Sequence, residues 1–215
     1  MIAQEDSAQA KILRTAFQLF HEQGYHATGV ATILREAGVN PGSMYHAFPG
    51  KEALLEEVLR YALTLLRPAV IAPVEAKEED PLNRVFGLLD QYRQGMVHNG
   101  CRMGCPIGNL ALEVSDDHRG ARVLIAANFE NWVKEVAAWL ESAGDRLPPD
   151  VDRARLARFV LTVMEGGLMQ ARAEGNLAPF DASVAELRTY FSLLEERALA
   201  TKIRKVPNKT KKVQK

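Results

Sequence analysis

The sequence predicts an all-α protein with two helical domains. Apolar residues recur at helical spacing along nearly the whole chain, and no stretch alternates polar and apolar residues as a half-buried strand does. Capping residues, glycines and prolines divide this pattern into segments of helical length. With 215 residues, 47% of them hydrophobic, the chain is long enough to bury a sizeable core. We expect about nine helices.

The first two helices are expected over residues 7–23 and 28–37. Gly24 follows the first apolar stripe and ends that helix. Thr28 precedes the second stripe, so it is expected to be the N-cap of the second helix. Both segments show the i, i+3, i+4, i+7 spacing of a helix that buries one face.

A turn over residues 37–40, Ala-Gly-Val-Asn, leads into a third short helix over residues 41–48. Asn40 before Pro41 places a capping residue ahead of a proline at the first helical position, which is a strong start signal. Two helices joined by a tight turn containing a glycine form a helix-turn-helix, whose second helix enters the DNA major groove. The pattern therefore predicts a nucleic-acid ligand.

The third helix should bury Met44 and Phe48 and turn its other face outward. That face has a glycine, two hydroxyls and an imidazole, which suit close approach to phosphates and base edges. A lysine at the start of the next helix adds a phosphate site. The alternative is a small bundle whose exposed aromatic residues have no task. We expect DNA contacts from Thr28, Pro41, Gly42, Ser43, Tyr45, His46 and Lys51.

Residues 24–55, GYHATGVATILREAGVNPGSMYHAFPGKEALL, resemble the N-terminal signature of the TetR family of bacterial transcriptional regulators. The match spans about residues 8–60, and the later stretch GCPIGNLALEVSD resembles a segment of the ligand domain in one branch of that family. Two positions depart from it, because Pro41 replaces a basic residue and Ala47 a second His or Tyr. The resemblance implies a repressor that a small-molecule inducer releases from a palindromic DNA operator.

The expected domains are a DNA-binding domain at 1–66, a ligand-binding and dimerisation domain at 67–201 and a basic tail at 202–215. Residues 68–80 should be a linker, since Pro68 stops the helix that begins at Lys51. Seven of the 27 basic residues lie in the tail, which leaves 20 against 27 acids, a net charge of −7, in the rest. The tail is expected to be disordered. Further helices are expected over residues 81–99, 119–143, 152–175 and 181–200, and a short one is expected to start at Cys105-Pro106.

A homodimer follows from the way a helix-turn-helix reads DNA. One such unit contacts few base pairs, whereas a two-fold dimer presents two units to half-sites about one helical turn apart. Wide apolar stripes on the last two helices favour a four-helix interface, although such stripes also form intrachain cores. The expected interface residues are Phe159, Val163, Leu187, Phe191 and Leu194.

The middle helices contain methionines and aromatic residues that are expected to line a ligand cavity. Such residues also form ordinary helical cores. Because few charged residues accompany them, the expected inducer is apolar or aromatic. The expected lining residues are Tyr92, Met96, Met103, Cys105, Leu110, Phe129, Trp132, Met164 and Met169.

Cys105 precedes Pro106, so it should cap a helix, where the helix dipole lowers a thiol pKa. This favours a thiol sensor of electrophiles or oxidants as an alternative function, while a buried structural cysteine is the plainer interpretation. His98, Cys101 and Cys105 lack a fourth ligand for a metal. No catalytic constellation, cofactor motif, signal peptide or membrane-spanning apolar run is evident, so we expect a cytoplasmic protein that is not an enzyme. An enzyme that uses the C-terminal pocket is the less favoured alternative.

Overall fold

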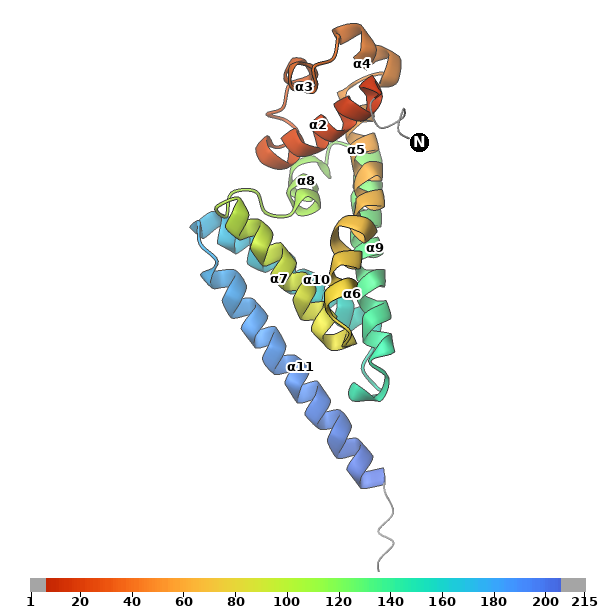
Figure 1. Ribbon diagram of the computed structural model, residues 1–215, viewed down its shortest axis with the longest axis vertical. Helices are drawn as coiled ribbons and strands as arrows, with labels where there is room; N and C mark the ends of the chain where they lie inside the picture. The colour runs from red at the N-terminus through yellow and green to blue at the C-terminus, as the bar shows by residue number, and fades with distance from the viewer. Residues whose placement is uncertain (1–6, 206–215) are drawn as a thin grey trace, which may run out of the picture.

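The computed structural model describes residues 7–205, apart from the side chains of Ser43, Tyr45 and Lys205. Within these residues the structure is helical and has no strand, which confirms the predicted all-α class. No helix among them is long and apolar enough to cross a membrane. Figure 1 shows a small group of helices at one end of the molecule and longer helices that extend away from it.

The small group consists of α2 (Ala8–Gln23), α3 (Val30–Ala37) and α4 (Pro41–Ala47). Gly38 ends α3 in the left-handed conformation with φ of 62°, which a glycine adopts without a steric penalty. Asn40 then caps α4, since its side-chain oxygen accepts a hydrogen bond from the Gly42 N–H at 3.2 Å. The predicted turn and helix start are therefore confirmed.

The predicted cap at Thr28 is wrong, because Gly29 is the N-cap of α3. The Thr28 side chain is fully buried, and its hydroxyl donates to the Gly24 carbonyl oxygen at 2.6 Å. This hydrogen bond stabilises the loop between α2 and α3 from its buried side. Thr28 consequently has no side-chain surface to offer DNA, and that expected contact is withdrawn.

The prediction of a linker over residues 68–80 is also wrong for most of this segment. Helix α5 (Lys51–Leu65) continues through a π-helical turn at Leu66–Ile71 into α6 (Ala72–Lys77). Pro68 lacks an N–H and crowds the preceding turn of an α-helix, and the wider π turn accommodates it. Ile71 and Val74 are buried in the core, so packing fixes the continuation.

The remaining helices are α7 (Pro81–His98), α8 (Pro106–Val114), α9 (Arg119–Ser142) and α10 (Arg153–Glu174), followed by α11 (Ala178–Lys205). The predicted caps Asp80, Cys105 and Asp152 each accept a hydrogen bond from a first-turn N–H. These three starts are confirmed, because each cap satisfies a backbone donor that the helix leaves unpaired.

The last helix is longer than expected at both ends. It begins three residues earlier than residue 181, where the Asn176 side chain accepts from the Ala178 N–H at 2.9 Å. It also continues to Lys205, and Lys202 Nζ lies 2.7 Å from Asp145 Oδ2. Residues 202–205 are therefore helical rather than part of a disordered tail, and the rest of the expected tail lies outside the described residues.

Two buried clusters hold the chain together. The larger one joins η1, α6, α7, α9, α10 and α11. The smaller one lies under the helix-turn-helix, and it also takes Leu110 and Val114 from α8 and Ile125 from α9. The core beneath the N-terminal helices is thus completed by residues well beyond position 66, so α8 and α9 are packed directly against the helix-turn-helix.

Three of the expected dimer residues belong to the core of their own chain. Leu187, Phe191 and Leu194 on α11 are only 2–4% exposed, and the Phe191 ring contacts Phe86 of α7 edge to face. Intrachain packing of α11 against its neighbours uses this stripe. Phe159, in contrast, is 46% exposed on α10 and remains available to a partner.

Candidate nucleic-acid interface and ligand cavity

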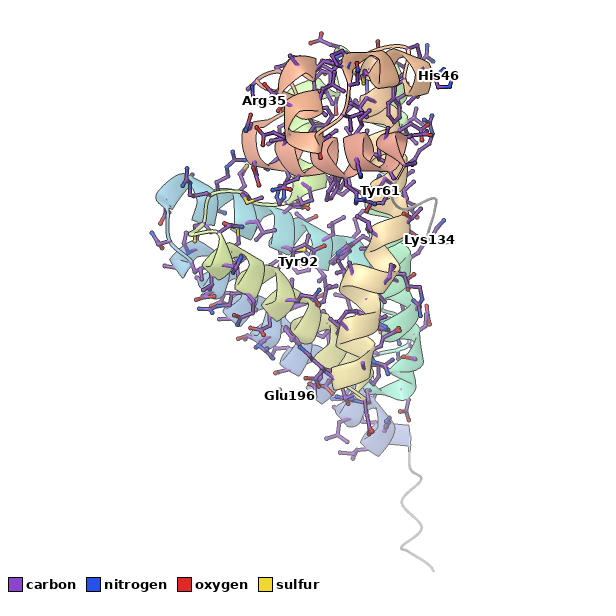
Figure 2. All side chains as sticks on the ribbon, turned by 45° about the horizontal axis from the view of Figure 1, so that its top comes forward. Arg35, His46, Tyr61, Tyr92, Lys134 and Glu196 are labelled. Atoms are coloured by element: carbon purple, nitrogen blue, oxygen red, sulfur yellow. The ribbon has the colours of Figure 1, made fainter. Side chains whose placement is uncertain are left out.

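The outer face of α4 is organised as the sequence predicts. Met44 and Phe48 are buried beneath it, while Pro41, Gly42 and His46 are exposed. Figure 2 shows His46 at the outer end of the helix-turn-helix, away from the rest of the chain. The side chains of the expected contacts Ser43 and Tyr45 lie outside the described residues. The position of α4 leaves one face of this helix free for a nucleic acid.

Lys51 begins α5, which follows α4 in the chain, and it is partly buried. Its Nζ lies 4.2 Å from the centroid of the Tyr25 ring, in a cation–π contact. Burial lowers the pKa of Lys51, and the nearby Glu113 carboxylate opposes that shift. Gly50 provides no side-chain cap, so the first turn of α5 relies on other partners for its N–H groups. A phosphate is one such partner.

The loop between α2 and α3 is held by a carboxylate from the second half of the chain. Glu113, near the end of α8, accepts hydrogen bonds from the backbone N–H groups of Tyr25 at 2.8 Å and His26 at 2.6 Å. Gly24 has φ of +87°, and a Cβ at this position would lie 2.9 Å from Glu113 Oε2. The positive φ therefore favours a glycine there, and a Cβ would also displace the Glu113 carboxylate from its present position.

Two further contacts join the helix-turn-helix to the second half. His21 Nε2 on α2 donates to the Gly104 carbonyl oxygen at 2.9 Å, and burial lowers the pKa of this imidazole. His118 packs edge to face on the Tyr25 ring, with its Nδ1 3.1 Å from Glu52 Oε1. These contacts, together with Glu113, tie the DNA-facing helices to the segment that contains α8.

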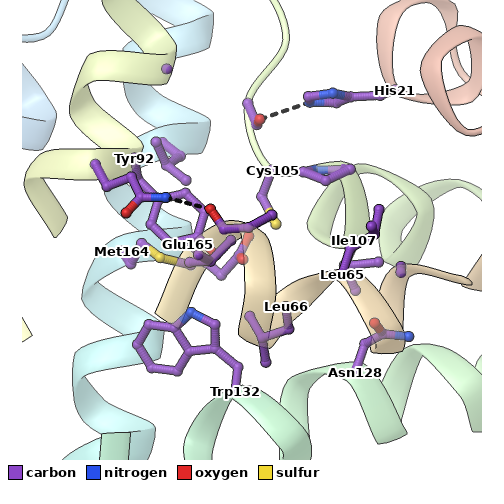
Figure 3. A pocket seen from close by; sticks show the side chains of 18 of the residues that line it. His21, Leu65, Leu66, Tyr92, Cys105, Ile107, Asn128, Trp132, Met164 and Glu165 are labelled. Carbon is purple, nitrogen blue, oxygen red and sulfur yellow. Dashed lines mark hydrogen bonds between the residues drawn. The ribbon is translucent and has the colours of Figure 1, made fainter. Parts of the chain in front are cut away.

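A cavity of about 330 Å³ lies next to this junction (Figure 3). It is bordered by α5, η1, α7, α9 and α10, by the start of α8, and by Phe17 and His21 of α2. Its size lies at the lower end of the range for small-molecule sites. Because α2 belongs to the helix-turn-helix, a molecule in the cavity would touch the DNA-binding unit directly.

Six of the nine expected ligand residues line this cavity, and three do not. Leu110 lies in the buried cluster under the helix-turn-helix, because α8 turns that side toward α2. Met169 is 56% exposed and borders a separate hollow between α8 and α10. Met103 lies in the loop before α8 and does not line the cavity. The six that line the cavity are Tyr92, Met96, Cys105, Phe129, Trp132 and Met164.

Sequence reasoning missed two kinds of lining residue. Phe17 and His21 were assigned to the DNA-binding unit, and no local pattern reveals that their helix closes the cavity. Glu165 had a readable signal, since it lies four residues after Leu161 on the stripe that also holds Leu168. An acid on an otherwise apolar stripe indicates a buried carboxyl group.

The titratable groups that line the cavity have pKa values shifted toward their neutral forms. Burial raises the pKa of the Glu165 carboxyl and that of the Tyr92 hydroxyl. Burial also raises the pKa of the Cys105 thiol, and the neighbouring Glu165 carboxyl adds to that shift. Cys105 caps α8 as predicted, but desolvation outweighs the helix dipole. The expectation of a reactive thiolate is therefore wrong.

No group of three or more histidine, cysteine, aspartate or glutamate side chains among residues 7–205 is arranged to hold a metal ion. Both cysteines are free and buried. Helix α4 exposes one face, and the contacts of Glu113, His21 and His118 join the helix-turn-helix to a helical second domain that holds an apolar cavity. These features define the class of helix-turn-helix DNA-binding regulators.

Comparisons with known proteins identify the family. Residues 12–58 match the model for bacterial regulatory proteins of the tetR family, and residues 81–186 match that of the transcriptional regulator LmrA/YxaF-like C-terminal domain. An HTH-type transcriptional regulator of Mycobacterium tuberculosis, Rv0196, is 32% identical over 185 residues, covering 83% of this chain and 91% of the relative. The chain belongs to the TetR family of HTH-type transcriptional regulators.

Other relatives and solved structures agree. The transcriptional regulator YxaF of Bacillus subtilis is 29% identical over 83% of this chain and 92% of its own length. The transcriptional repressor DhaR of Mycobacterium sp. (strain GP1) is 29% identical over 76% and 82%. A TetR regulator from Chloroflexus aurantiacus superposes with a TM-score of 0.76 at 26% identity, covering 88% of this chain and 96% of that chain. These relatives are regulators, so the chain is not an enzyme.

Proposed function

We propose that this chain is a homodimeric repressor that a small apolar or aromatic molecule releases from a palindromic operator. The observation that carries the proposal is the cavity itself, whose wall includes α2 of the DNA-binding unit and the first turn of α8. One relative is described as a transcriptional repressor, which favours repression over activation. A repressor of bacterial genes would work in the cytoplasm.

The proposed DNA contacts centre on the N-terminal part of α4 and the start of α5. Pro41 and Gly42 are exposed at the first turn of α4, and a Cβ at Gly42 would lie 3.9 Å from Asn40 Oδ1, an ordinary van der Waals contact. A backbone without a side chain can approach a phosphate closely at such a position. His46 follows one turn later on the same face, and Ser43 and Tyr45 complete the proposed set with Lys51.

The proposed dimer interface uses the outward face of α10 and α11. Phe159 and Tyr190 meet edge to face with ring centroids 5.8 Å apart, and Leu193 lies further along the same helix with 57% exposure. Large apolar side chains grouped in this way mark an interaction surface. Val163 borders a hollow beside them. A four-helix interface of two copies would cover this face.

The proposed route from ligand to DNA runs through α8. Cys105, Pro106 and Ile107 line the cavity at the start of this helix, and Glu113 near its end holds the loop before α3. A ligand that binds better when α8 is displaced would shift the loop and the orientation of α4. The free energy of ligand binding needs to differ between the DNA-binding and the displaced state by only about 1–3 kcal/mol.

The proposal is tested by selecting binding sites from random double-stranded DNA with the full-length protein. The expected result is an inverted repeat whose halves are about one helical turn apart, or 34–36 Å. A selected site without two-fold symmetry would contradict the dimeric repressor. Release is then measured as the loss of operator affinity when aromatic compounds are added, and no response to any compound that binds the cavity would contradict the inducer role.

A further inference from the structure

Lys51 lies in an unfavourable place for a lysine, at the first position of a helix. The N-terminus of a helix carries a partial positive charge, which disfavours a nearby cation. Gly50 supplies no side-chain cap to α5, and burial lowers the pKa of Lys51. A residue that conflicts with its local surroundings in this way is expected at a functional site rather than at a purely structural one.

The ring of Tyr25 is the group that holds the Lys51 ammonium. The Lys51 Nζ lies 4.2 Å from the centroid of this ring, within the range of a cation–π interaction. Among residues 7–205 no carboxylate forms an ion pair with Lys51. The Glu113 carboxylate acts on Lys51 only at longer range, since its two oxygens accept from the backbone N–H groups of Tyr25 and His26. The aromatic face is thus the direct partner of the ammonium group.

Tyr25 is itself fixed by contacts on several sides. It is only 5% exposed, and its ring meets the rings of Phe20 and His118 edge to face, with centroids 5.3 Å and 5.2 Å away. Its backbone N–H donates to Glu113 on α8 at 2.8 Å. Packing and hydrogen bonds of this kind restrict a side chain to one orientation. The ring therefore offers a fixed site to the flexible side chain of Lys51.

We propose that Tyr25 is a positioning residue for DNA binding, whose ring holds the Lys51 ammonium group in place for a phosphate of the DNA backbone. Ordering a lysine side chain at the moment of binding costs conformational entropy, and the contact with the ring orders it beforehand. Lys51 is only partly buried, so its side chain keeps exposed surface for the phosphate. This inference rests on the proposed function, because it adds a residue to the proposed DNA contact of Lys51.

A carboxylate in direct contact with Lys51 would serve this purpose less well than the ring. It would cancel the charge of Lys51 and would repel the DNA backbone, which is itself negative. The ring attracts an ammonium group through its quadrupole and carries no net charge. It also takes no acceptor oxygen to the ammonium, so N–H donors remain for the phosphate. The contact therefore holds Lys51 and leaves its charge to act on DNA.

The test is a double-mutant cycle between Tyr25→Leu and Lys51→Ala in the full-length protein. Because a phosphate contact does not depend on base sequence, the probe is a fluorescein-labelled duplex of mixed sequence, about 30 base pairs long. We expect Lys51→Ala to weaken its binding about tenfold and Tyr25→Leu about two- to fivefold. Tyr25→Leu should have almost no effect in the Lys51→Ala background. An equal loss in both backgrounds would overturn the proposal.

Fluorination of the ring separates the cation–π contact from packing. Tyr25→Phe keeps the ring and should bind the duplex within about twofold of the parent. A trifluorinated phenylalanine at the same position keeps the shape but withdraws electrons from the ring face, so it should bind about two- to fivefold more weakly than Tyr25→Phe. Equal affinities of these two proteins would overturn the proposal, and the comparison stands even if Tyr25→Leu does not fold.

Phe17→Leu is the matched control for the loss of an aromatic ring. Phe17 belongs to the same group of helices, and its ring packs edge to face on Tyr61 with centroids 5.9 Å apart. Any effect of Phe17→Leu on DNA affinity should be equal in the parent and in the Lys51→Ala background, because sites that do not contact each other act additively. A coupling as large as that of Tyr25→Leu would assign the effect to the general packing of the domain and overturn the proposal.

The outcomes separate this inference from the proposed function. If Lys51→Ala binds DNA like the parent, the proposed contact of Lys51 is contradicted, and the inference fails with it. If Lys51→Ala weakens binding but Tyr25→Leu is additive with it, the contact stands and the positioning role is wrong. Nuclear magnetic resonance provides a readout without DNA, because the ring current of Tyr25 should shift the ε-methylene protons of Lys51 upfield. An unshifted signal in the parent would overturn the proposal.

Discussion

The Glu113 carboxylate on α8 accepts a hydrogen bond from the Tyr25 backbone N–H at 2.8 Å, which joins the ligand side of the molecule to the helix-turn-helix. Glu113 lies eight residues after Cys105 at the cavity, on a single short helix. A rigid helix carries a displacement from one end to the other with little loss. In the proposed mechanism, a change in the cavity reaches the DNA-binding unit through this contact as well as through Phe17 and His21 of α2, which line the cavity.

Replacing Glu113 by alanine should loosen this junction. The Tyr25 N–H is partly buried and would lose its partner, so we expect a loss of about 1–3 kcal/mol in the free energy of unfolding. Glu130→Ala, which removes an exposed pairing with Arg158, should change it by less than about 0.5 kcal/mol. Urea denaturation followed by circular dichroism measures both variants, and similar values for the two would show that the Glu113 contacts contribute little.

The DNA contacts predict a difference between two lysine substitutions. Lys51→Ala removes a charge at the start of α5 beside the proposed interface, whereas Lys134→Ala removes one from an exposed position on α9 (Figure 2). We expect Lys51→Ala to weaken binding to the selected operator and to random DNA alike, and to reduce the salt slope by about one. Lys134→Ala should leave both unchanged.

Fluorescence anisotropy titrations at several salt concentrations measure these affinities. Tyr45→Ala serves as the companion variant, and it should weaken binding to the operator more than binding to random DNA if the ring reads base edges. Parent-like affinity for both Lys51→Ala and Tyr45→Ala would place the DNA contacts elsewhere.

The sequence was sufficient for features set by local chemistry. Asn40 before Pro41, Asp80 and Cys105 each fixed a helix start, because a capping side chain acts within three residues. It was insufficient where distant packing decides. Thr28 has the composition of a cap, but the loop around Gly24 draws its hydroxyl inward.

On the longer helices, too, the sequence predicts which residues are apolar but does not predict what they pack against. The stripe that contains Leu187 and Phe191 is apolar on either interpretation, and only the position of α7 shows that it packs within its own chain. The cavity could likewise be predicted only in part. Its aromatic and methionine walls follow from composition, whereas closure by Phe17 and His21 depends on how α2 docks.

Neighbouring leucines on α11 test the dimer interface. Leu193 is 57% exposed and Leu194 is 4% exposed, so they point to solvent and to the core, respectively. Leu193→Glu should dissociate the dimer and keep the melting temperature of the monomer fold, because the new charge is buried only in the interface. Leu194→Glu should instead lower the melting temperature, since it places a charge in the intrachain core.

Size-exclusion chromatography with light scattering gives the mass of each variant, and differential scanning calorimetry gives its melting temperature. Tyr190→Glu should behave like Leu193→Glu, because its ring lies on the same face against Phe159. A Leu193→Glu variant that stays dimeric at micromolar concentration would place the interface on another surface.

Cys105 tests the thiol-sensor alternative through its pH dependence. Burial raises the pKa of its thiol, so the thiolate should be scarce near neutral pH and alkylation by iodoacetamide should be slow there. The folded state holds this proton more tightly than the unfolded chain. The contribution of Cys105 to stability should therefore be constant below the ordinary thiol pKa, near 8.5, and should fall as the pH rises above it.

Cys105→Ser should reduce that decline above about pH 8.5, because a serine hydroxyl does not titrate in this range. Cys101→Ser is the matched control, and it should keep the decline, since Cys105 remains in place. Mass spectrometry of alkylated peptides identifies which thiol reacts, and urea denaturation at several pH values gives the stability. Rapid alkylation of Cys105 at pH 7, together with loss of ligand response in Cys105→Ser, would favour the thiol sensor over a noncovalent inducer site.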